Sequence, residues 1–143
     1  MEEIIQLLHR EQCSCVIANG EIRTFRQRGV ADLYELLHKE PGFLKNASVA
    51  DKVIGKAAAA LMISGGVKEI YADVISRPAL TLLQQAHIKV SPEQITDHIE
   101  NRNHTGWCPL ENICSQARTV TEILPLIRRF IERQSGSSRK ENN

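Results

Sequence analysis

The stretch over residues 48–66, SVADKVIGKAAAALMISGG, constrains the fold most strongly because its apolar side chains recur at every fourth position. This spacing is typical of a helix with one broad apolar stripe. Ser48 is a suitable N-cap, Asp51 follows three residues later, and a glycine pair supplies a left-handed end. The pattern therefore predicts a central helix over residues 48–66, with Asp51, Lys52 and Lys56 in its first turns.

The totals point to one ordinary globular domain. The chain has 143 residues, 42% hydrophobic and 24% charged, which suits a single core. Its net charge of +1 gives no overall field for nucleic acid or a membrane surface, and its six aromatic side chains leave little for base stacking. The N-terminus is acidic and amphipathic, unlike a signal peptide, and no apolar run reaches the roughly 18 residues of a membrane span. We expect a cytoplasmic protein without a membrane or nucleic-acid partner.

The rest of the chain alternates between strand and helix patterns. Asn19-Gly20 is a strong two-residue turn signal, and it predicts a hairpin of strands over 13–18 and 21–26. Further strands are expected over 68–75, 88–90 and 95–102, and further helices over 1–10, 30–39, 76–87, 110–117 and 121–134. Residues 135–143 are rich in Ser, Lys and Asn and are predicted to be a disordered tail after a single domain over 1–134.

This order of elements predicts an α/β fold. A hairpin followed by alternating strands and helices gives a three-layer α/β/α arrangement with a mixed sheet, in which crossover helices cover both faces. Ligand sites in such sheets form where helix N-termini meet the carboxyl ends of strands. Residues 48–56 and 76–79 are expected to lie at such positions.

The same order of elements resembles the cytidine deaminase-like fold. The stretches SVADKVIGKAAA, EIYADVISRPALTLL and GWCPLE are similar to a bacterial family of uncharacterised small domains with that fold. The resemblance covers about residues 10–130, and it therefore implies a deaminase-like domain.

The resemblance does not extend to the metal site of the catalytic deaminases. Those enzymes hold zinc with a His or Cys near the start of one helix and a Pro-Cys-x-x-Cys at the start of the next, and a Glu shuttles protons. At the matching places this chain has Ala50-Asp51-Lys52 and Pro78-Ala79-Leu80-Thr81-Leu82. We therefore expect no metal or other cofactor, and no zinc-dependent deamination.

The polar residues at the two expected helix starts predict an anion site. Free N–H groups and positive potential at a helix N-terminus suit a phosphate or carboxylate, and cationic side chains beside them add to this preference. The predicted ligand is a nucleotide-like or other anionic small molecule. The proposed contacts are Ser48, Asp51, Lys52, Lys56, Ser76 and Arg77. Each also has a structural interpretation as a cap or a solvated charge, and Asp51 is a candidate base or nucleophile if the protein is an enzyme.

Two other classes of function stay open. In the first, the Ala-rich helix face and Gly55 serve close packing between subunits, so that the chain is an interaction protein or homo-oligomer. In the second, Cys108 is the nucleophile of a cysteine-dependent enzyme, because it lies in a polar loop just before a predicted helix. His104 is the nearest candidate base in the sequence. Cys13 and Cys15 are interpreted as core residues.

Overall fold

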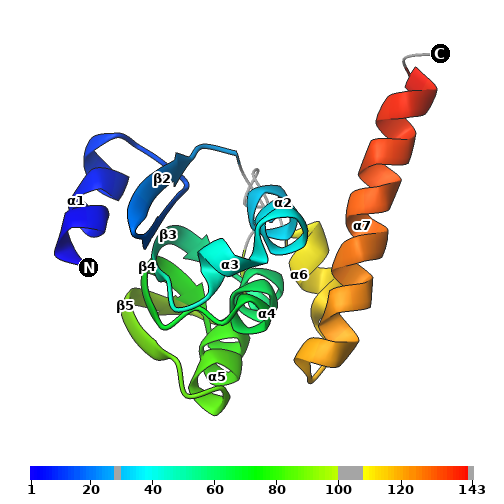
Figure 1. The fold of residues 1–143 in the computed structure, drawn as a ribbon. Coiled ribbons are helices and arrows are strands. Elements are labelled where there is room, and N and C mark those ends of the chain that lie inside the picture. The colour runs from blue at the N-terminus through cyan, green and yellow to red at the C-terminus, as the bar shows by residue number, and fades with distance from the viewer. Residues whose placement is uncertain (28–29, 100–107, 142–143) are drawn as a thin grey trace.

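The computed structural model describes residues 1–27, 30–99 and 108–141 and has a five-stranded sheet with strand order β2-β1-β3-β4-β5 (Figure 1). The strands are β1 (Cys15–Asn19), β2 (Glu21–Phe25), β3 (Ser48–Ile54), β4 (Glu69–Ser76) and β5 (Lys89–Thr96). The helices are α1 (Glu2–Arg10), α2 (Ala31–Lys39), α3 (Pro41–Leu44), α4 (Lys56–Gly65), α5 (Arg77–Gln85), α6 (Pro109–Cys114) and α7 (Val120–Glu141). The sheet is mixed because β1 is antiparallel to β2 and β3, whereas β3, β4 and β5 are parallel.

The predicted hairpin is confirmed. Asn19 pairs with Glu21 at its end, and Gly20 between them has a φ of +79°, a conformation that glycine adopts without steric cost. The Asn19 amide also donates hydrogen bonds of 2.9 Å to the carbonyl groups of Phe43 and Lys45. The turn is therefore attached to the segment that leads into β3.

The predicted helix over residues 48–66 is wrong in its first half. Ser48–Ile54 forms β3, the central strand, and only Lys56–Gly65 forms α4. Three of the seven strand residues are Val or Ile, which favour a strand, and β3 pairs on both sides, with β1 and with β4. The apolar residues of β3 are followed directly by those of the buried helix α4, and this continuity produces the fourfold spacing. Gly55 is the N-cap of α4, and the predicted glycine end of the helix is confirmed by Gly66 with a φ of 82°.

The helices are distributed unevenly over the two faces of the sheet, and the expectation that crossovers cover both faces is wrong. Since β3, β4 and β5 follow one another in one direction across the sheet, right-handed crossovers place α4 and α5 on the same face. The main core, which includes most of α4, lies on this face. Figure 1 shows α4 and α5 on one side of the sheet and α1 on the other. The opposite face carries α1, whose Ile4 and Leu8 are buried against Val16, Ala50 and Tyr71. The α/β class and the mixed sheet are confirmed.

Several element ends differ from the prediction. β5 continues past residue 90 through Pro92 to Thr96, which is tolerated because β5 is an edge strand. Parts of the predicted strand over 95–102 and of the loop before α6 fall on residues 100–107, outside the described residues. Helix α7 continues to Glu141, into the segment predicted to be a disordered tail. None of the helices among the described residues is both long and apolar enough to cross a membrane.

Candidate functional site

The strands β2, β3, β4 and β5 all end at one edge of the sheet, which we call the helix-start edge. β2 and β3 point the same way because both are antiparallel to β1, and β4 and β5 are parallel to β3. Ile54 pairs with Ile75, so the residues that follow, Gly55 and Ser76, start α4 and α5 side by side. Ligand sites of open α/β sheets form at this kind of edge.

The start of α4 already binds an anion, the carboxylate of Glu111 from α6. The Lys56 backbone N–H donates a 2.9 Å hydrogen bond to Glu111 Oε2, and Glu111 is only 5% exposed. Gly55 makes this approach feasible, since a Cβ at that position would collide with the same oxygen. The predicted anion position at Lys56 is therefore occupied by a carboxylate of the chain itself, as expected for the free N–H groups and dipole of a helix start.

The side chain of Lys56 lies in the same buried cluster. It is 9% exposed, and its Nζ donates a 3.3 Å hydrogen bond to the Ser115 carbonyl at the end of α6. Cys114 lies close to both charges: burial and the negative charge of Glu111 raise its pKa to about 11, and the positive charge of Lys56 opposes this rise. The start of α4 thus combines a carboxylate, an ammonium group and a thiol that stays protonated at neutral pH.

At the neighbouring start of α5, the predicted cap is confirmed. Ser76 is fully buried, and its Oγ accepts a 3.3 Å hydrogen bond from the Ala79 N–H. Arg77 donates to Asp97 at 3.2 Å, and both of these side chains are largely exposed. Such an exposed ion pair contributes little to stability, so Arg77 is free to exchange its partner at small cost.

Two predicted contacts lie on β3 rather than at a helix start. Ser48 is at the opposite end of β3, where its hydroxyl donates to Glu69 Oε1 at 2.8 Å. Lys52 is exposed on β3, so it does not share a helix face with Lys56. The predicted set is therefore divided: Lys56, Ser76 and Arg77 belong to the two helix starts, and Ser48 and Lys52 belong to β3.

Asp51, the predicted catalytic candidate, lies inside the sheet rather than in a first helical turn. It is 8% exposed and accepts a 3.2 Å hydrogen bond from the Val53 N–H. Burial raises its pKa to about 7, although hydrogen bonds from Val53 and from the Cys15 thiol favour the ionised form. Burial and the nearby Asp51 raise the pKa of Cys15 well above its ordinary value. A carboxyl group with a pKa near 7 is suited to accept and release protons at neutral pH.

The cysteines are placed mostly as predicted. Cys13 and Cys15 are buried, which confirms their interpretation as core residues. Cys108 is half-buried at the start of α6, and its N–H donates to the Ile99 carbonyl at 2.7 Å. His104 lies outside the described residues, so its pairing with Cys108 stays a prediction. Among the described residues, no cluster of three His, Cys, Asp or Glu side chains could hold a metal ion.

Sequence reasoning missed Glu111. Glu111 belongs to the stretch GWCPLE, but a carboxylate 55 positions after Lys56 has no local signal that links it to the start of α4. Gly55 was the available signal, because a glycine next to a helix indicates the close approach of another group.

The fold and its edge define the class: a small mixed α/β domain whose helix starts gather at one edge of the sheet. The chain belongs to the family described as TM1506, domain of unknown function (DUF1893), whose model matches residues 3–131. This confirms the expected membership of a family of uncharacterised domains. A solved structure, that of a DUF1893 family protein (TM1506) from Thermotoga maritima at 2.70 Å resolution, matches with a TM-score of 0.82. The match has 21% sequence identity and covers 90% of this chain and 87% of that chain, so it shows a shared fold. No curated protein matches the chain.

Proposed function

We propose that this chain is a zinc-free, cytidine deaminase-like domain that binds a small anionic or nucleotide-like ligand at the start of α4. The observation that carries the proposal is the hydrogen bond from the Lys56 N–H to the Glu111 carboxylate, in space left by Gly55. A position that accepts one carboxylate has the donor and the potential to accept an external carboxylate or phosphate in its place.

The boundary between β3 and α4 changes which residues correspond to the zinc motif of the deaminases. The helix after β3, α4, begins at Lys56, so the residues at the place of the deaminase motif are Gly55-Lys56-Ala57 rather than Ala50-Asp51-Lys52. None of these three side chains is a zinc ligand. The proposal is therefore one of binding, in which charge at the helix start takes the role that a metal would have in a catalytic relative.

Three groups would hold the ligand. The Lys56 N–H and the α4 dipole receive its anionic group, the Lys56 ammonium balances the charge, and Arg77 at the start of α5 offers a second cation. Ser76 contributes by fixing the start of α5. If a reaction accompanies binding, Asp51 stays the candidate acid or base and Cys108 the candidate nucleophile.

The oligomerisation hypothesis loses its two original reasons. The alanines of α4 are buried within the core of the single chain, so their face is not available to a second subunit. The close approach at Gly55 is made by Glu111 of the same chain. A homo-oligomer would therefore need a different surface.

Thermal-shift measurements with inorganic phosphate, a nucleoside monophosphate and a sugar phosphate test the proposal. At least one of them should raise the melting temperature of the wild type, and Lys56→Met should remove the gain. Lys52→Met is the matched control, because the same change falls on an exposed lysine of β3 that is not part of a helix start. The absence of a response to all three anions, together with a stable oligomer in light scattering, would overturn the proposal in favour of an interaction protein.

A further inference from the structure

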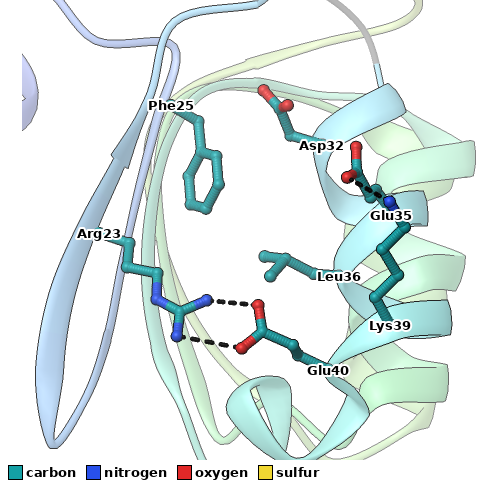
Figure 2. Close-up of a pocket in the computed structure, with 7 residues that line it drawn as sticks. All are labelled: Arg23, Phe25, Asp32, Glu35, Leu36, Lys39 and Glu40. Carbon is teal, nitrogen blue, oxygen red and sulfur yellow. Dashed lines mark hydrogen bonds and ion pairs between the residues drawn. The ribbon is translucent and has the colours of Figure 1, made fainter.

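A separate cavity of about 220 Å³ lies between β2 and α2 (Figure 2). Its middle is apolar, with the Phe25 ring on the β2 side and Leu36 on the α2 side. The ion pair of Arg23 and Glu40 closes one end, and the Asp32 carboxylate lies at the other end. The cavity therefore has an apolar middle and a polar group at each end.

Most charges around this cavity are already paired. Arg23 donates to Glu40 Oε2 at 2.8 Å and to Glu21 Oε1 at 2.8 Å. Lys39 donates to Glu35 at 3.1 Å along the helix. Among the described residues that line the cavity, Asp32 is the charged side chain without an ion pair. The uncompensated charge of the cavity is thus negative.

The surroundings of Asp32 show that a cation would be favourable there. Burial and the charge of Glu35 raise its pKa, against a hydrogen bond from the Gln27 backbone. Burial raises the pKa of Cys15, and the charges of Asp51 and Asp32 add to that effect, so the local field behind Phe25 is negative as well. Asp32 lies in the first turn of α2, where a carboxylate stabilises the helix dipole. That role alone does not require the aromatic wall and open volume beside it.

We infer that this cavity binds a small organic cation, with an ammonium group against Asp32 and an apolar body along Phe25 and Leu36. A volume of about 220 Å³ gives room for a short alkyl or similarly small amine. The Phe25 ring can add a cation–π contribution beside the charge pair. This site has the opposite charge preference to the anion position at α4, and it stands independently of the proposed function.

An NMR titration of the full chain with butylammonium chloride tests the inference, with butyrate and butan-1-ol as probes of matched length. Butylammonium should shift the resonances of cavity-lining residues, and Asp32→Asn should weaken its binding about tenfold. Asp97→Asn is the control variant, since it changes the net charge equally at an exposed position outside the cavity and should leave the affinity unchanged.

Two results would overturn the inference. One is equal affinity of the wild type and Asp32→Asn for butylammonium. The other uses the wild type alone and therefore holds even if Asp32→Asn fails to fold: butan-1-ol or butyrate shifting the same resonances at the same concentration. A preference of at least about tenfold for the cation over both other probes supports the assignment.

Discussion

Asp51 places a carboxyl group inside the central strand of the sheet, and replacing it by asparagine should change how stability depends on pH. The pKa of Asp51 is raised from 3.8 to about 7, mainly because burial disfavours the charged form. Asp51→Asn keeps the size of the side chain and one acceptor oxygen for the Val53 N–H. It removes the ionisation altogether.

The magnitude follows from the two pKa values. The folded state binds the proton more tightly than the unfolded chain, so the contribution of Asp51 is fully present below pH 4. It is lost as the pH rises from about 4 to about 7. A difference of about three pH units, at about 1.4 kcal/mol for each, corresponds to about 4 kcal/mol. The asparagine variant has no such loss, so the free energy of unfolding of the variant minus that of the wild type should increase by about 4 kcal/mol between pH 4 and pH 8.

Urea denaturation of both proteins over this pH range measures the effect. A constant loss of about 1 kcal/mol is expected from the replacement of an acceptor oxygen by a donor, and it does not vary with pH. Asp97→Asn serves as the control, because it is the same substitution at a largely exposed carboxyl group, where the burial on which the effect depends is absent. If the difference between the wild type and Asp51→Asn changed by less than about 1 kcal/mol over the range, the reasoning from burial would be refuted.

Two further predictions concern the contacts around α4. Glu111→Ala removes a buried carboxylate from the Lys56 N–H and should lower the free energy of unfolding by about 1.5 to 3 kcal/mol. Millimolar formate or acetate should restore part of this lost stability. If these anions did not change the denaturation of the variant, the assignment of an anion site at Lys56 would be contradicted. Gly65→Ala should cost about 1 to 3 kcal/mol, because its Cβ would lie 2.8 Å from the Leu44 side chain in the core. Gly42→Ala is the matched change with nothing within 4 Å of the new Cβ, and equal melting temperatures for these two variants would contradict the packing argument.

Much of the fold could be predicted because its signals are local. The Asn19-Gly20 turn, the Ser76 cap and the alternation that marks β4 each lie within a few residues of the structure they specify. The boundary at Gly55 could not be placed in the same way. The sequence SVADKVI of β3 has no strict alternation of polar and apolar residues that sets it apart from a helix, and the pairing of β3 with β1 and β4 decides between them.

The candidate site was predicted in part for the same reason. Ser76 could be predicted as a helix-start residue from its capping signal. Lys56 was predicted two turns inside a helix over residues 48–66, and the structure places it at the start of α4 instead. Glu111 could not be predicted, because only the tertiary packing of α6 brings it to the α4 start. Ser48 and Lys52 depended on an assumed helix, and they moved away from the site together when that segment proved to be a strand.

The Glu111 carboxylate competes with any external anion for the Lys56 N–H at the α4 start. Because Glu111 belongs to the same chain, it competes at an effective concentration that does not fall on dilution, of millimolar order or higher for tethered groups. An external ligand can bind only to molecules in which Glu111 has moved away from the Lys56 N–H. Its apparent affinity is therefore its intrinsic affinity multiplied by the fraction of such molecules. A monovalent carboxylate, chemically equivalent to Glu111, gains little over this internal competitor. A doubly charged phosphate that also reached Arg77 would bind more strongly than Glu111 does. The competing carboxylate of Glu111 would thus make the site selective for ligands of higher negative charge.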